Sequence, residues 1–320
     1  MSTLLIALRP NSLTDEQLAS VEAAAADMQV VITNDRERIE ALLPDVRIVL
    51  GMFPRDLLAK APRLEWFQQW GAGADWLLEH PQVVDSDLLV TNTAGVHAVP
   101  IGEHVLAYLL AFARGLPSAM RHQLERDWRP LRQAELFELE GKSMLLVGAG
   151  RVGSRVAHLG SAFGMHVAAV RRNAELPVEG AATVHATGEL LGLLPTADFV
   201  VLTVPLTADT RGLIGAPQLA AMKDTAYLVN IGRGGTVDEP ALIAALTAGK
   251  LAGAGLDVFE EEPLPPTSPL WTMENVIITS HYAGATPRYV ERVLEIFLDN
   301  LARFKRGEPL RNEVDKRLGY

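Results

Sequence analysis

The stretch that decides the fold of this chain is Met144-Leu-Leu-Val-Gly148-Ala-Gly150-Arg-Val-Gly153. The apolar run 144–147 predicts a buried parallel strand, and the apolar periodicity over 152–163 predicts a helix. In a dinucleotide site the first glycine of the turn allows a sharp bend, and the second lets the pyrophosphate approach the backbone. The third glycine lets the helix pack close to the strand. We therefore predict a dinucleotide site that uses all three, against the alternative of a glycine-rich turn that binds nothing.

The end of the next predicted strand, 165–170, indicates which dinucleotide is bound. NAD sites carry an acidic residue here, which accepts hydrogen bonds from the ribose hydroxyls. This chain has Arg171-Arg172-Asn173 instead. A guanidinium group can bind a 2′-phosphate with two parallel hydrogen bonds, whereas a carboxylate repels it. The two arginines favour NADP, with NAD as the alternative if they form only a solvated strand end.

Length and composition limit the classes of protein. The chain has 320 residues, enough for two domains, with 48% hydrophobic and 21% charged residues, as in ordinary globular enzymes. The net charge of −10 argues against a nucleic-acid or anionic-membrane partner. The absence of cysteine excludes disulfides, thiolate metal sites and a cysteine nucleophile. We find neither a signal peptide nor an apolar run long enough to span a bilayer, and we expect a cytoplasmic protein.

Strand and helix patterns alternate in two blocks, which predicts an α/β protein with two domains. The first block predicts strands at Leu4–Ala7, Val46–Gly51, Glu65–Gln68 and Leu88–Thr91 and helices at Thr14–Ala25 and Asp35–Leu43, with a capping box of Thr14 and Gln17. The second block predicts a Rossmann-type, doubly wound parallel sheet with strands at Met144–Val147, His166–Val170, Phe199–Thr203, Tyr227–Ile231, Gly253–Val258 and Val276–Thr279.

Two long helices mark the domain boundaries. One begins near Pro100 and runs to about Arg114, where Gly115-Leu-Pro117 breaks it before a second helical segment, Ser118–Asp127. The other, about Pro287 to Lys305, is amphipathic and returns to the first block. We therefore expect the dinucleotide-binding domain (99–286) to be inserted in a smaller, flavodoxin-like βα substrate domain (1–98 and 287–320).

Polar residues follow the strands of the second block at their carboxyl ends, where ligands of such sheets bind. They are Thr203, Thr207, Asn230, Arg233, Asp257, Glu262 and His281. An arginine, two carboxylates and an imidazole would therefore meet at the edge that carries the glycine turn, which predicts a catalytic cleft. Singly, each has another interpretation. Asp257 could be satisfied by backbone amides, Glu262 could belong to a solvated acidic turn, His281 could be packed in the core, and Arg233 could brace a loop.

With these motifs the chain resembles the D-isomer-specific 2-hydroxyacid dehydrogenase family, in particular its glyoxylate and hydroxypyruvate reductases. The similarity covers nearly the whole chain and is strongest from Asn92 to Arg288. The segments that carry it are 141–153, 204–214 (Val-Pro-Leu-Thr-Ala-Asp-Thr-Arg-Gly-Leu-Ile), 228–235 (Leu-Val-Asn-Ile-Gly-Arg-Gly-Gly), 253–263 and 279–286.

The resemblance implies a role for particular residues. Arg233 would bind substrate, Glu262 would pair with His281, and the amides of Ala72 and Gly73 would hold the substrate carboxylate. The cofactor residues implied in addition to the glycines and arginines are Arg151, Val152, Val204, Pro205, Ile231 and, at the nicotinamide end, Asp257. The family usually dimerises through the region after the interdomain helix, which here carries Trp128, so we expect a homodimer. Two residues depart from the family pattern, Arg171 in place of an acid and Thr203 in place of a histidine.

These residues suffice for the reduction of a small 2-keto acid without a metal. An unperturbed imidazole carries a proton near working pH, so His281 is the expected acid, and Glu262 would favour its imidazolium form. Arg233 would polarise the ketone oxygen. One alternative is an NAD-dependent enzyme with another substrate, such as phosphoglycerate or lactate. Another is a nucleotide-sensing corepressor, a reading disfavoured by the retained histidine, glutamate and arginine.

Overall fold

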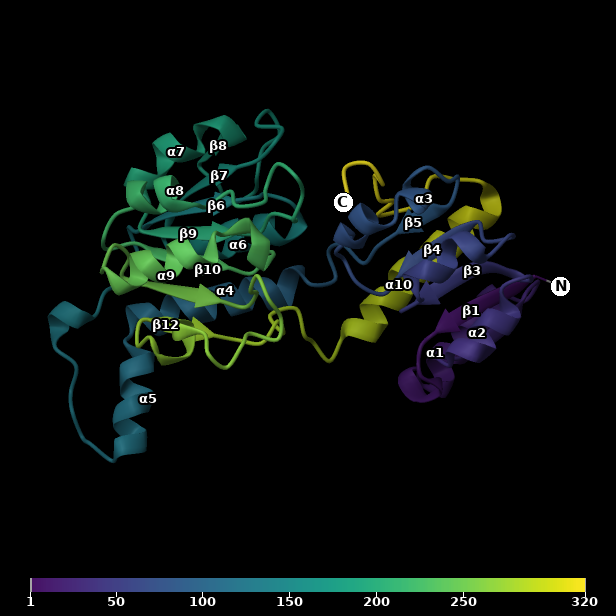
Figure 1. Cartoon of the computed structure of the whole chain (residues 1–320), viewed down its shortest axis with the longest axis horizontal. Coiled ribbons are helices and arrows are strands. Elements are labelled where there is room, and N and C mark those ends of the chain that lie inside the picture. The colour runs from purple at the N-terminus through teal and green to yellow at the C-terminus, as the bar shows by residue number, and fades with distance from the viewer. Residues whose placement is uncertain (1, 320) are drawn as a thin grey trace. The chain divides into compact units, whose positions relative to one another are not determined.

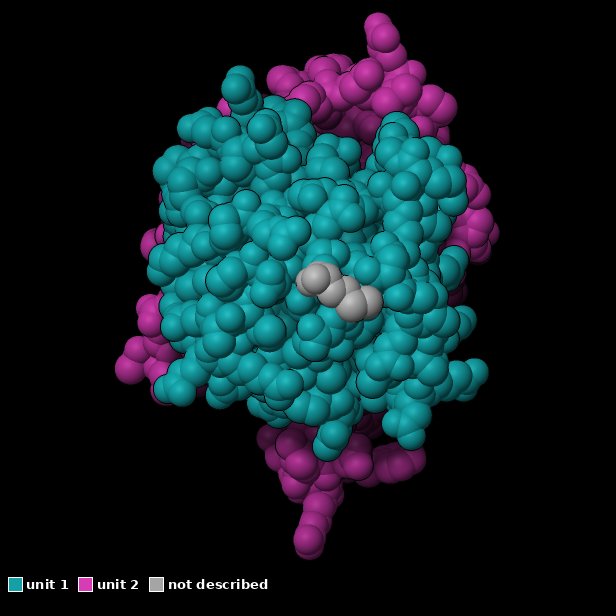
Figure 2. Space-filling model, turned by 90° about the vertical axis from the view of Figure 1, so that its right-hand side faces the viewer, with its two compact units in different colours: residues 1–96, 286–320 teal, residues 97–285 magenta. Residues whose placement is uncertain are grey.

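The structure is a computed structural model that describes residues 2–319. The chain divides into two compact units, which Figure 2 shows in different colours. The first comprises the chain up to residue 96 and from residue 286 onward, and the second comprises residues 97–285. The boundaries expected from the sequence, 98/99 and 286/287, lie two residues and one residue later along the chain.

The first unit contains a five-stranded parallel sheet with the strand order β2-β1-β3-β4-β5, a flavodoxin-like order. Its strands are β1 (Thr3–Ala7), β2 (Gln29–Ile32), β3 (Val46–Gly51), β4 (Trp66–Gln69) and β5 (Leu89–Thr91). The sequence did not predict β2. This strand lies at the edge of the sheet and buries only Val31, so it lacks the continuous apolar run of an inner strand.

The helices of the first unit cover both faces of its sheet (Figure 1). They are α1 (Asp15–Ala24), α2 (Arg36–Leu42), α3 (Pro81–Val84) and α10 (Tyr289–Arg306). The capping box predicted for α1 is confirmed, because the Thr14 amide donates to Gln17 Oε1 at 2.9 Å and the Gln17 amide donates to Thr14 Oγ1 at 3.2 Å. The C-terminal helix α10 packs on this sheet, where the ring of Phe297 stacks on Trp66 at 5.3 Å.

The second unit contains a seven-stranded parallel sheet with the order β12-β11-β10-β9-β6-β7-β8, a doubly wound arrangement that confirms the predicted fold class. Its strands are β6 (Ser143–Val147), β7 (His166–Val170), β8 (Thr183–His185), β9 (Phe199–Leu202), β10 (Tyr227–Asn230), β11 (Gly253–Leu256) and β12 (Val276–Ile278). The sequence did not predict β8, which is again an edge strand, and none of its three residues is buried.

Apolar cores cover both faces of this sheet. The helices are α4 (Ala98–Ala113), α5 (Leu116–Glu125), α6 (Arg151–Ala162), α7 (Leu190–Leu193), α8 (Ala216–Ala221) and α9 (Glu239–Thr247). Helix α4 ends where Gly115 adopts a left-handed conformation, so the predicted break is confirmed. Figure 1 shows α5 and the segment after it projecting away from this sheet. Within residues 2–319 no helix combines the length and hydropathy needed to cross a bilayer.

Candidate active site

The carboxyl edge of the second unit's sheet carries the polar residues that the sequence singles out. The strands are parallel and in register, so Val147, Val170, Leu202, Asn230, Leu256 and Ile278 all end at this edge. The strand ends, the loops that follow them and the start of helix α6 carry every predicted site residue of this unit. We take them in order along the edge, from the glycine turn to the last strand.

The glycine turn between β6 and α6 has the geometry of a phosphate cradle. A Cβ atom at Gly148, where φ is +96°, would lie 2.7 Å from a methyl carbon of Val204, and one at Gly153 would collide with the carbonyl oxygen of Gly148. A Cβ at Gly150 would meet no atom within 4 Å, so the space in front of this backbone is open. Helix α6 begins at Arg151, and its first-turn amides offer hydrogen bonds and a partial positive charge to a pyrophosphate.

The loop after β9 closes one side of this turn. Thr203 Oγ1 donates to the carbonyl oxygen of Gly148 at 2.5 Å, so the threonine ties the loop to the glycine turn. Val204 and Pro205 follow, and Thr210 Oγ1 donates to the Pro205 carbonyl at 2.6 Å. The Thr207 amide in turn donates to Thr210 Oγ1 at 2.8 Å. Thr203 and Thr207, selected from the sequence as strand-end polar groups, therefore hold the shape of this loop.

The two arginines lie where the second strand ends. The amide of Arg171 continues the sheet by donating to the His185 carbonyl at 3.0 Å, and its side chain is partly buried. Arg172 is exposed, and its Nη2 lies 4.0 Å from Asp209 Oδ2 in the loop after β9. The side chains of this pair are 55% and 86% exposed, and such solvated pairs contribute about 0–1 kcal/mol.

The loop after β10 presents Arg233. Buried Asn230 organises it, because its Oδ1 accepts from the Gly232 amide and its Nδ2 donates to the Arg233 carbonyl, both at 3.1 Å. Thr236 Oγ1 donates to the same carbonyl at 2.7 Å. Arg233 Nη1 donates to the Gly232 carbonyl at 2.8 Å, so the arginine does brace its own loop. Ile231, also in this loop, is buried.

Glu262 and His281 form the pair that the resemblance implies. His281 Nδ1 lies 2.7 Å from Glu262 Oε2, and Glu262 Oε1 accepts from the Phe259 amide at 3.0 Å. Because a carboxylate can only accept, Nδ1 carries the proton of this bond and Nε2 is the nitrogen left for chemistry. The two side chains are 49% and 35% exposed. His281 is therefore not a packed core histidine, and Glu262 is tied to its loop, unlike a free acidic turn.

Asp257, in contrast, is only 2% exposed. Its Oδ1 accepts from the Thr279 hydroxyl at 2.5 Å and from the Tyr282 amide at 3.0 Å, and its Oδ2 accepts from the Ala283 amide at 3.0 Å. The carboxylate thus holds the loop that contains His281. This geometry matches the alternative in which backbone amides satisfy Asp257, and the nicotinamide contact that the resemblance implies stays a prediction.

The structure adds a residue that the sequence did not place among the catalytic groups. His97 Nδ1 lies 3.0 Å from the carbonyl oxygen of Gly284 in the His281 loop. Burial lowers the pKa of His97, and the positive charges of Arg233 and His281 lower it further. His97 therefore belongs to the same cluster as a neutral imidazole. Its relation to Gly284 arises only from the fold, because the two residues are far apart in the sequence.

The predicted carboxylate-binding loop, with Ala72 and Gly73, follows β4 in the first unit. Gln69 shapes it, because Nε2 donates to the carbonyls of Gly71 and Gly73, both at 2.7 Å. Gln69 Oε1 in turn accepts from Trp76 Nε1 at 2.8 Å. With the carbonyls of this loop bound to Gln69, its geometry is fixed locally. Its role in substrate binding stays a prediction.

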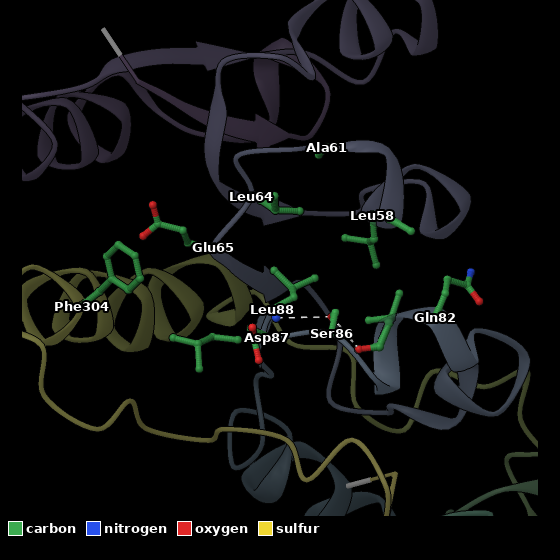
Figure 3. A pocket seen from close by; sticks show the side chains of 12 residues that line it. Leu58, Ala61, Leu64, Glu65, Gln82, Ser86, Asp87, Leu88 and Phe304 are labelled. Atoms are coloured by element: carbon green, nitrogen blue, oxygen red, sulfur yellow. Dashed lines mark hydrogen bonds between the residues drawn. The ribbon is translucent and has the colours of Figure 1, made fainter.

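A cavity of about 530 Å³ in the first unit lies away from this loop. Figure 3 shows its lining, which includes Leu64 and Glu65 just before β4 and Leu88 just before β5. It therefore lies at the amino ends of these strands, whereas Ala72 and Gly73 follow the carboxyl end of β4. This cavity is not part of the candidate site.

The chain is similar to known proteins of one family. Residues 106–283 match the model of the D-isomer specific 2-hydroxyacid dehydrogenase NAD-binding domain. The chain is 36% identical to a glyoxylate reductase of Korarchaeum cryptofilum over 289 residues, which is 88% of this chain and 85% of the relative.

Solved structures are similar over nearly the whole chain. One is a D-isomer specific 2-hydroxyacid dehydrogenase from Xanthobacter autotrophicus in complex with NADPH and MES, with a TM-score of 0.86, 31% identity and coverage of 100% and 99% of the two chains. Another is an NADPH-dependent glyoxylate/hydroxypyruvate reductase from Sinorhizobium meliloti in complex with NADP and sulfate, with a TM-score of 0.85, 28% identity and full coverage of both chains.

Proposed function

This chain belongs to the D-isomer specific 2-hydroxyacid dehydrogenase family, and we propose that it reduces glyoxylate or hydroxypyruvate with a preference for NADPH. The observation that carries the proposal is the 2.7 Å pair of His281 and Glu262 on the sheet edge that holds the glycine turn. The names of the relatives and the NADP complexes among the similar structures support it.

The cofactor fits the residues of the second unit. The open space at Gly150 and the first-turn amides of α6 suit a pyrophosphate, and Arg171 and Arg172 suit a 2′-phosphate. We assign further cofactor contacts to Val204, Pro205, Ile231 and Asp257. When bound, a nicotinamide would supply the hydride, and the protein would supply position and electrostatics.

Side chains and backbone amides of the protein donate the proton to the keto acid and bind its carboxylate. His281 donates a proton from Nε2 to the carbonyl oxygen of the keto acid, while Glu262 keeps Nδ1 protonated and the ring oriented. Arg233 polarises that oxygen, and the amides of Ala72 and Gly73 bind the carboxylate. In the oxidative direction His281 accepts the proton again, because the same path must serve both directions.

An activity screen tests this proposal. Reduction of glyoxylate, hydroxypyruvate, pyruvate and phosphohydroxypyruvate would be followed with NADPH and with NADH. We expect the highest kcat/KM for one of the first two substrates with NADPH. A higher value with NADH, or for phosphohydroxypyruvate, would overturn the corresponding part of the proposal and favour the NAD-dependent alternative.

We also propose that two copies of the chain associate through α5 and the segment after it. Leu116, Met120, Leu124 and Trp128 expose large apolar side chains there, with Leu124 84% and Trp128 98% exposed. Apolar surface of this kind marks interaction sites. We predict that Trp128→Asp shifts the protein from dimer to monomer in light-scattering chromatography. Trp271→Asp, at another exposed tryptophan, should leave the mass unchanged, and a monomeric wild type would exclude the dimer.

A further inference from the structure

We propose that Tyr108 and His104 on α4 are positioning residues for His281 and act on it through Thr279 and Asp257. The inference rests on the proposed role of His281 as proton donor. Its basis is a chain of contacts between α4 and the His281 loop. Tyr108 Oη lies 2.5 Å from Thr279 Oγ1, and His104 Nε2 lies 3.1 Å from the same atom.

The direction of each hydrogen bond follows from the number of protons available. Thr279 has one hydroxyl proton, and it donates this proton to the carboxylate of Asp257 at 2.5 Å. Its oxygen can then only accept from the other two groups. Tyr108 must therefore donate its hydroxyl proton, and His104 must carry a proton on Nε2. Both residues of α4 support the threonine in the orientation that serves Asp257.

The surroundings favour these protonation states. Tyr108 is 3% exposed, and burial raises the pKa of its hydroxyl, so the donor keeps its proton. Burial lowers the pKa of His104, which favours a neutral ring with a single N–H. The ring of His104 also makes edge contacts with Tyr108 at 4.7 Å and with Tyr282, the residue after His281, at 5.6 Å.

Asp257 connects Thr279 to His281, because it accepts hydrogen bonds from the loop that contains this histidine. Its carboxylate accepts from the amides of Tyr282 and Ala283, and its backbone carbonyl accepts from the His281 amide at 2.8 Å. His281 has a φ of +54°, a conformation that side-chain-bearing residues rarely adopt and that neighbouring contacts must maintain. Without the Tyr108 hydroxyl, Thr279 is free to turn away from Asp257, and the imidazole loses its alignment with the substrate.

The first test is Tyr108→Phe, which removes one hydroxyl and keeps the ring. Since a misplacement of about 1 Å can cost up to ~100-fold in rate, we expect kcat for keto-acid reduction to fall about 10-fold, with KM for NADPH unchanged within about twofold. The matched control is Tyr227→Phe, which also removes one hydroxyl and keeps the ring. Tyr227 is the first residue of β10, so it lies at the amino ends of the strands, and its ring stacks on Phe199 at 5.4 Å. This variant should retain the wild-type kcat.

Conservative variants separate positioning from simple packing. Thr279→Ser keeps the hydroxyl and should retain most of kcat, whereas the isosteric Thr279→Val should lose as much as Tyr108→Phe. His104→Gln keeps an N–H donor and should be more active than His104→Leu. If activity follows side-chain volume instead of the presence of the donor, the proposal is wrong. If Tyr108→Phe fails to fold, the comparison of Thr279→Ser with Thr279→Val still tests whether the hydroxyl is required.

A double variant tests whether the effect passes through His281. In single-turnover reduction, Tyr108→Phe should add no further loss to His281→Ala, because the group that it positions is already absent. A further 10-fold loss in the double variant, or a kcat for Tyr108→Phe within twofold of wild type, would overturn the inference. An active His281→Ala variant would instead refute the proposed function itself, so the two failures are distinguishable.

Discussion

The carboxyl edge of the second unit has two halves that are built differently. Around β6 and β7, the groups offered to the cofactor are backbone amides and two arginines, of which Arg171 is partly buried and the Arg172 side chain is 55% exposed. Around β11 and β12, side chains are joined by bonds of 2.5–2.7 Å, and the central carboxylate, Asp257, is 2% exposed. Binding tolerates mobile side chains, whereas proton transfer needs fixed geometry. Substitutions in the first half should therefore change cofactor binding, and those in the second half should change kcat.

The largest expected effect is that of His281→Ala. We predict a loss of about two to four orders of magnitude in kcat, with nearly unchanged NADPH binding, because a general acid assists only the chemical step. Arg233→Ala should instead damage both KM and kcat, since it would contact the substrate as well as the developing charge. Steady-state kinetics and cofactor titration measure both. Retention of more than about a tenth of kcat by His281→Ala would exclude it as the proton donor.

The next effect tests the nucleotide half of the edge. We predict that Arg171→Asp lowers the kcat/KM ratio of NADPH to NADH by about one to two orders of magnitude at low salt. A hydrogen bond to a charged group contributes about 1.5–3 kcal/mol, and the new carboxylate repels the 2′-phosphate. Arg132→Ala, at an exposed arginine of the same unit, is the control. A variant that still prefers NADPH would show that the arginines form only a solvated strand end.

A smaller effect distinguishes the three successive glutamates. Glu262 contacts His281, while Glu260 and Glu261 are exposed. Glu262→Gln replaces the carboxylate that holds His281 Nδ1 at 2.7 Å, so the ring should lose its fixed orientation and kcat/KM for keto-acid reduction should fall about 10-fold. The measurement is kcat/KM for Glu260→Gln, Glu261→Gln and Glu262→Gln. Three equal values would remove Glu262 from the mechanism.

The smallest effect concerns stability. Burial lowers the pKa of His104 and of His97 below the ordinary value of 6.5. In acid, these two histidines therefore bind more protons in the unfolded chain than in the folded chain. The free energy of unfolding should therefore decrease as the pH falls below about 6.5. His104→Gln should make this decrease shallower in urea titrations, and His166→Gln, at an exposed histidine, should not. Equal pH dependence in all three proteins would contradict this account.

Several features could be predicted from the sequence because they depend on local patterns. The glycine turn, the inner strands and the break at Gly115 each carry a signal within a few residues. The edge strands β2 and β8 escaped prediction because exposure leaves them without a continuous apolar run. The parallel order of the strands was enough to bring Arg233, Glu262 and His281 to one edge of the sheet.

The sequence by itself determined which groups reach that edge, because the ends of strands and the glycine turn depend on only a few neighbouring residues. Only the tertiary structure decided what those groups do there. It showed that both oxygens of Asp257 are occupied by the loop of His281, and that His97, His104 and Tyr108 contact the same loop from α4 or just before it. The contacts of His97, His104 and Tyr108 join residues more than 170 positions apart. No local pattern encodes them, because they depend on how helix and sheet pack.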